Sequence, residues 1–271
     1  MTRLGLLIAG GVLATGCMKS DGSITAAQAQ NAGDALGTGI EDSAKGFGPM
    51  NASASADAPC VVLSGDTADT DQDNIPANAR LTFNCTALAL GYTGTLTGTE
   101  TVMDDMPTAA WWAFTGAADL HATLTGPFGG TIVRDWSGEL KGTQATVGGP
   151  FATARTVSVT TVFTPPGAHA HATTVTEDND WAVTFTPMAT WTPGGVAVTG
   201  SLWATGTWNA TVDGLEIAAS LSTPTPVKLD PTCATRATAG QVRGTYGVGA
   251  TMRSITVTWT GCGARTVVFG S

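Results

Sequence analysis

Most of this chain alternates between apolar and polar residues with a period of two, which is the pattern of β-strands. The alternation is clearest over 92–102, where every second residue is threonine: Thr93, Thr95, Thr97, Thr99 and Thr101. Similar runs occupy 181–186 and 255–260. Successive side chains of a strand point to opposite faces, so these runs predict a sheet with a threonine-rich face and a more apolar one.

Glycine and proline separate the alternating runs, for example at 126–130, 148–150, 165–167, 193–195 and 224–226. Asp213-Gly214 lies between two such runs and is typical of a tight β-hairpin. Many short strands joined by such turns predict an all-β fold, with a single antiparallel domain over 58–271. A large antiparallel β-sandwich and a barrel-like meander both fit, and the pattern does not choose between them.

A different pattern precedes this domain. Four apolar residues recur at every fourth position: Ala32, Leu36, Ile40 and Ala44. That spacing predicts a helical stripe. Three glycines, Gly33, Gly37 and Gly39, weaken such a helix by about 1 kcal/mol each. We therefore expect 17–57 to be a flexible, partly helical tether that acts as a spacer. Docking on the domain, or pairing with a partner, is the alternative.

The first residues have the three parts of a secretory signal: one basic residue, Arg3, an apolar run over 4–13, and small residues before Cys17. The run is shorter than the roughly 20 residues that a membrane-spanning helix needs. Thr15-Gly16-Cys17 resembles the lipobox of bacterial lipoproteins. The resemblance implies a signal peptide over 1–16, cleavage before Cys17, and a palmitate-type acyl anchor on that cysteine.

Several acyl chains hold a protein stably on a membrane, so the expected first partner is the membrane itself. Met18 stands where members of the lipoprotein class that stay in the inner membrane have Asp. The resemblance therefore implies an outer-membrane lipoprotein with its domain facing the periplasm or the cell surface. The formal net charge is −9, and an acidic surface repels phosphate backbones. We expect no nucleic-acid partner.

Five cysteines occur in the chain, and lipidation of Cys17 leaves an even number. The remaining four form two well-separated local pairs, Cys60 with Cys85 and Cys233 with Cys262. Four cysteines allow three connectivities. We predict the two local pairings, because each would join neighbouring strands in an oxidising compartment.

An acidic loop lies between the first two of these cysteines. Its carboxylates are Asp66, Asp69, Asp71 and Asp73. The alternate spacing of 69–73 resembles part of the calcium loops of EF-hands and thrombospondin type 3 repeats, and calcium prefers several carboxylate oxygens. Arg80 stands where an EF-hand has its closing Glu, so the expected calcium site is incomplete. The alternative is a solvated acidic loop.

Two tryptophans, Trp111 and Trp203, lie at the alternating positions that polar residues occupy in their predicted strands. A tryptophan on a polar sheet face can stack a sugar or seat an apolar ligand, so they are the candidate ligand face. The alternative is that another part of the chain covers them. His121 stands alone, and His169 and His171 are too few for a zinc site, so all three are expected at the surface.

No motif in the sequence indicates a catalytic site. The tether, the acidic loop and the segment 259–263 together resemble uncharacterised lipoproteins of Gram-negative bacteria, a group that implies no activity. We therefore expect a lipid-anchored, non-enzymatic β domain that binds a protein or glycan partner. The alternative is a carrier that holds a lipid or another hydrophobic ligand in a barrel cavity.

Overall fold

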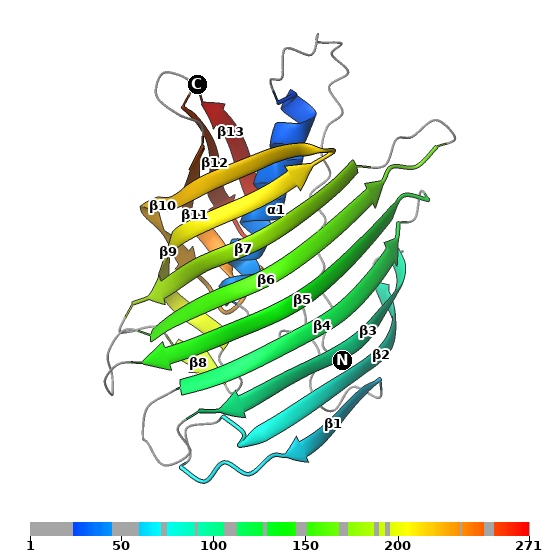
Figure 1. Ribbon diagram of the computed structural model, residues 1–271, viewed down its shortest axis with the longest axis vertical. Coiled ribbons are helices and arrows are strands. Elements are labelled where there is room, and N and C mark those ends of the chain that lie inside the picture. Colours follow the sequence, from blue (N-terminus) through cyan, green and yellow to red (C-terminus); the bar gives the residue numbers. More distant parts are fainter. Residues whose placement is uncertain are drawn as a thin grey trace.

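The computed structural model describes residues 24–44, 60–71, 75–89, 92–105, 113–126, 129–144, 151–167, 173–186, 190–192, 196–233, 235–246 and 252–270. The all-β prediction is confirmed. One helix, α1 (Ala26–Ala44), precedes a 13-stranded sheet (Figure 1).

The strands are β1 (Val61–Asp66), β2 (Asn78–Ala89), β3 (Tyr92–Asp104), β4 (Ala113–Thr125), β5 (Thr131–Gln144), β6 (Phe151–Thr164), β7 (Thr173–Phe185), β8 (Thr190–Thr192), β9 (Val196–Val212), β10 (Leu215–Leu229), β11 (Ala237–Tyr246), β12 (Arg253–Gly261) and β13 (Ala264–Gly270). They follow one another across the sheet in chain order, except that the short β8 lies off the main path and pairs with β9. The arrangement is therefore one antiparallel meander.

Both a sandwich and a barrel-like meander were compatible with the sequence, and the structure is a meander. In the part of the chain that the structure describes, β1 and β13 are the two edges of the sheet and do not pair with each other. The later strands curl around α1, while β1 to β6 extend away from it (Figure 1). The predicted hairpin at Asp213-Gly214 joins β9 to β10.

Each face of this sheet is continuous, because directly opposed residues point the same way. One such row runs from Arg155 in β6 through Trp181 and Gly206 to Leu221 in β10. Residues of this row contact α1, so we call this side of the sheet the inner face. The other side, with the threonines of β3, is the outer face.

The helix begins with a capping box: the N–H of Gln28 donates to Thr25 Oγ1 at 3.2 Å, and the N–H of Thr25 donates to Gln28 Oε1 at 3.0 Å. The predicted helical stripe is confirmed. All four of its residues are completely buried against the inner face: Ala32, Leu36, Ile40 and Ala44. The helix packs on β7, β9, β11, β12 and β13. The helical part of the expected tether is therefore part of the folded domain, and the spacer interpretation is wrong for it.

A second, smaller core lies on the inner face of the earlier strands. Its buried members are Val61, Phe83, Leu96, Leu120, Trp136 and Val159. These residues come from β1 to β6, whereas the main core gathers α1 and the strands around it. The sheet thus has two cores on its inner face, and most of the contacts with the helix come from β7 and the strands after it.

Candidate functional site

The most elaborate chemistry of the described chain lies where α1 meets the inner face. Arg265 of β13 holds the middle of the helix: its Nε donates to Asp34 Oδ1 at 3.1 Å and its Nη1 to Glu41 Oε1 at 3.0 Å. The same Glu41 oxygen accepts the indole N–H of Trp259 at 2.8 Å. One guanidinium therefore joins two turns of the helix to the last strands of the sheet.

A second set of charges surrounds the end of the helix. Arg134 of β5 pairs with Asp42 at 3.2 Å, and Asp42 is almost fully buried. Arg155 of β6 donates to the carbonyl of Gly39 at 3.0 Å and lies over the ring of Trp181. The two arginines thus join β5 and β6 to the second half of the helix.

Burial changes the ionisation of this cluster. It raises the pKa of the Glu177 carboxyl, which outweighs the lowering effects of Arg134, of the hydrogen bond from Trp208 and of Arg155. That hydrogen bond runs from Trp208 Nε1 to Glu177 Oε1 at 2.8 Å. Burial likewise lowers the pKa of Arg155, although Asp42 and Glu177 act in the opposite direction. Desolvation is therefore the largest influence on both groups.

Asp42 of α1 and the strand residues Arg134, Arg155 and Glu177 interact electrostatically where the helix meets the inner face. Buried ion pairs of this kind fix one arrangement of the elements they join and add little net stability over apolar packing. We interpret the cluster as the seat that fixes the position of α1.

The outer face carries exposed polar groups. One row across it contains Thr82, Thr99, Asp119, Ser137, Ser158 and Asp178, in adjacent strands from β2 to β7. The next row contains Asn84, Thr97, His121, Asp135, Thr160 and Thr176. Neighbouring strands lie about 4.8 Å apart, so these side chains form a dense array of hydrogen-bonding groups.

His121, predicted to be at the surface, lies in this array. Its Nδ1 is 2.5 Å from Asp135 Oδ1, and its Nε2 is 3.1 Å from Thr123 Oγ1. An ionised carboxylate only accepts, so Nδ1 donates to Asp135, and in the neutral imidazole Nε2 accepts the hydroxyl of Thr123. The order hydroxyl, imidazole, carboxylate is that of an acyl-transfer triad.

The surroundings of these three residues do not complete such a triad. β4 is paired on both sides, so its backbone N–H groups already donate within the sheet and do not form an oxyanion hole. The side chains of His121 and Asp135 are 47% and 55% exposed, which leaves them in water. We therefore interpret the trio as part of a polar contact surface.

The described carboxylates of the acidic loop are Asp66, Asp69 and Asp71. Asp66 and Asp69 are exposed, and Asp66 accepts the backbone N–H of Ala68 at 3.0 Å in its own turn. Asp71 is partly buried, and Asp73 lies outside the described residues. Over the ranges that the structure describes, no group of three or more His, Cys, Asp or Glu side chains is placed to hold a metal ion. The expected convergence of these aspartates is thus not found there, and calcium binding stays a prediction.

The candidate ligand face is described only in part. Trp203 lies on the outer face in β9, opposite Thr184 of β7, and is half-buried. Trp208 of the same strand points inward and is completely buried. Trp111, His169 and His171 lie outside the described residues, as does Cys17.

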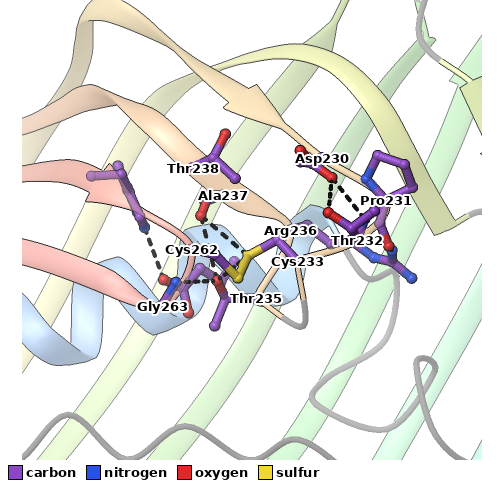
Figure 2. The surroundings of a disulfide bond; sticks show 12 residues. Asp230, Pro231, Thr232, Cys233, Thr235, Arg236, Ala237, Thr238, Cys262 and Gly263 are labelled. Atoms are coloured by element: carbon purple, nitrogen blue, oxygen red, sulfur yellow. Dashed lines mark hydrogen bonds between the residues drawn. A yellow bond between two sulfur atoms is a disulfide. The ribbon is translucent and has the colours of Figure 1, made fainter. Parts of the chain in front are cut away.

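Both predicted cysteine pairings are confirmed: Cys60 bonds to Cys85 and Cys233 to Cys262. The first links the residue before β1 to β2 at one edge of the sheet. The second links the turn before β11 to the β12–β13 hairpin (Figure 2). Each disulfide therefore lies near one edge of the meander.

Hydrogen bonds surround the disulfide between Cys233 and Cys262 (Figure 2). Asp230 Oδ1 accepts the N–H of Thr232 at 2.7 Å and its hydroxyl at 2.6 Å, and these bonds lower the pKa of the Asp230 carboxyl. Thr235 Oγ1 accepts the N–H of Gly263 at 3.2 Å. The disulfide thus lies between two turns that are already held by hydrogen bonds.

Sequence reasoning missed the charges of the inner face, although a signal was present. Arg155 and Glu177 lie at the alternating positions that apolar residues occupy in their strands. Val159 in β6 and Val183 in β7 are buried apolar residues at such positions. A charge at an apolar phase indicates a buried polar partner. For Arg155 and Glu177 these partners are on the helix and on neighbouring strands.

The chain matches no family model, and the searches of curated proteins and of solved structures find no match either. Within the ranges that the structure describes, no helix combines the length and apolarity needed to cross a bilayer.

Proposed function

We propose that this protein is a lipid-anchored envelope lipoprotein whose β domain binds a protein or glycan partner through its outer face. Cys17 carries the anchor, and the β domain has no enzymatic role. The leader and Cys17 support the anchor, while the inner face is taken up by packing. The outer face is the broad surface left for a partner.

The polar array of the outer face is the observation that carries the binding proposal. Thr97, Asp119 and Asp178 are exposed and point the same way from three strands of a rigid sheet. Fixed side chains bind at a smaller entropic cost than mobile ones. Many hydroxyl and carboxylate groups at regular spacing suit a partner rich in hydrogen-bonding groups, such as a glycan or a polar protein surface.

The anchor is tested by fractionation and intact mass. We expect the full chain to sediment with membranes and to have the mass of residues 17–271 plus acyl chains. A Cys17→Ser variant should be soluble after export. Recovery of the unmodified wild-type chain in the soluble fraction would refute the anchor.

The outer face is tested by glycan-array binding and by titration with candidate envelope proteins. The variant Asp119→Ala with Asp178→Ala alters the array without touching α1. We expect it to lose binding, whereas Asp69→Ala, which removes an exposed carboxylate from the loop between β1 and β2, should retain it. Equal binding by both variants would place the partner elsewhere.

The carrier is the other candidate, and the second core on β1 to β6 is the observation that favours it. Its apolar residues lie on the inner face of β1 to β6. Native mass spectrometry of the protein from its own membranes distinguishes the two. An organic mass lost on denaturation would favour a carrier, and its absence would favour the outer face.

A further inference from the structure

The docking of α1 determines how far the domain can lie from a membrane anchor at Cys17. Cys17 lies seven positions before Ile24, where the described chain begins. A fully extended chain spans that separation in at most about 25 Å. The 17 residues of β9 extend over about 55 Å. The segment from Cys17 to Ile24 is therefore shorter than half the length of β9. Only the end of the domain near Ile24 can then approach the membrane.

That end is identified by the direction of α1. Gly33 lies against Val267 of β13, whereas Asp34 and Glu41 contact Arg265. The helix continues from Gly33 back to Ala26 over about 10 Å, and β13 continues from Val267 to Gly270 over a similar distance. The beginning of α1 is thus level with the end of β13, and both lie at the top of Figure 1.

The surface at this end has two exposed apolar side chains and one arginine. Val268 is 57% exposed, and Met252, directly before β12, is 50% exposed. Arg253 follows Met252 and is opposite Tyr246 in the sheet, and Tyr246 and Phe269 pack against the main core. Exposed apolar side chains beside an arginine suit the boundary between lipid headgroups and acyl chains, with the guanidinium near anionic headgroups.

We propose that the end of the domain formed by the start of α1, the start of β12 and the end of β13 rests on the surface of an anionic lipid bilayer. The inference rests on the proposed anchor at Cys17. Arg253 contacts lipid headgroups, while Met252 and Val268 enter the interfacial layer. The long strands then stand away from the membrane, and the polar array of the outer face stays accessible to partners.

The test places a fluorescent label at this end of the acylated full chain. Acylation occupies Cys17 and disulfides occupy the other four cysteines, so an introduced cysteine is the single free thiol. We label Val268→Cys with an environment-sensitive dye and reconstitute the protein in vesicles of phosphatidylcholine and phosphatidylglycerol. The control is Ser137→Cys, an exposed position on the outer face of β5.

We expect the dye at Val268→Cys to shift to the blue and to be quenched by brominated acyl chains, and the dye at Ser137→Cys to do neither. Each variant is checked for cooperative unfolding. If Val268→Cys does not fold, Thr266→Cys replaces it on the same side of β13.

Two failures are distinguishable. A chain that does not float with vesicles would refute the anchor and hence the proposed function. A chain that floats while both labels stay in water, or with only Ser137→Cys quenched, would refute this orientation and leave the anchor intact. Loss of quenching in vesicles without phosphatidylglycerol would show that anionic headgroups hold this end down.

Discussion

A basic side chain contacts a carboxylate on both sides of this sheet. On the inner face, Arg134 and Asp42 are 13% and 1% exposed. On the outer face, His121 and Asp135 are about half exposed. Removing charges from water costs several kcal/mol per ion, whereas an exposed pair costs little and gains little. The two inner side chains therefore depend on each other and on their geometry to offset the cost of burial. The two outer side chains do not, because they stay in water.

This difference in burial gives the charges on the two faces of the sheet different roles. The inner charges fix α1 in one position, because each loses its solvation and depends on a particular neighbour. The outer charges stay hydrated and free to meet a partner. The threonines and aspartates of the outer face can thus vary with little effect on folding, while the seat of α1 cannot.

The largest effect is expected from breaking the inner pair. Asp42→Ala leaves the guanidinium of Arg134 buried without its carboxylate, and we expect a loss of about 3–5 kcal/mol in the free energy of unfolding. Urea unfolding followed by tryptophan fluorescence measures it. Replacing both residues by leucine should recover part of the loss. A loss below 1 kcal/mol for Asp42→Ala would show that water reaches the pair.

A smaller loss is expected from Gly39→Ala. A Cβ at this position would lie 2.7 Å from Cη2 of Trp181, so the ring or the helix must shift. Overpacking of this kind costs about 1–3 kcal/mol, against a gain of about 1 kcal/mol in helix propensity. The control Ala27→Gly removes a methyl group from the exposed first turn and should cost about 1 kcal/mol. If Gly39→Ala stabilises the protein, α1 is not seated as described.

The ionisation of Glu177 predicts a pH dependence. Burial raises the pKa of this carboxyl in the folded protein above the unfolded value of about 4.3. Between the two values the folded state binds more protons, so its stability falls as the pH rises above about 4.3. Glu177→Gln removes this titration and keeps an acceptor for Trp208. We expect its stability relative to the wild type to increase with pH. A difference that does not change with pH would contradict this.

The smallest effect is expected on the outer face. Asp135→Asn removes the charge that orients His121, and we expect a change of less than about 1 kcal/mol in the free energy of unfolding. Added salt should reduce the change further, since both side chains are exposed. Thermal unfolding at low and high ionic strength measures it. A loss as large as that of Asp42→Ala would overturn the comparison.

Patterns within single strands predicted much of the fold. The period of two marks the long strands, and Asp213-Gly214 marks a hairpin, because both depend on residues close in the chain. The stripe from Ala32 to Ala44 predicted the helix for the same reason. The cysteine pairings also followed from local spacing.

The position of α1 did not follow from the sequence, because its partners are far along the chain. Gly33 and Gly39 counted against the helix when only local propensity was considered. In the structure they bring its backbone close to Val267 and Trp181. Likewise, nothing in the local sequence indicates that Asp34 and Glu41 bind Arg265. Propensity describes an isolated segment, whereas these residues are explained by tertiary contacts.

The pairing of Asp34 with Arg265 spans 231 positions, which has a consequence for the order in which the molecule assembles. A chain made from its N-terminus produces the helix first and the strand that holds it last. Contacts between distant segments form slowly, because a long loop must close before they stabilise anything. The helix therefore has to wait for the end of the chain. A product shortened before Ala264 would lack Arg265, and the carboxylates of Asp34 and Glu41 would lose their cation.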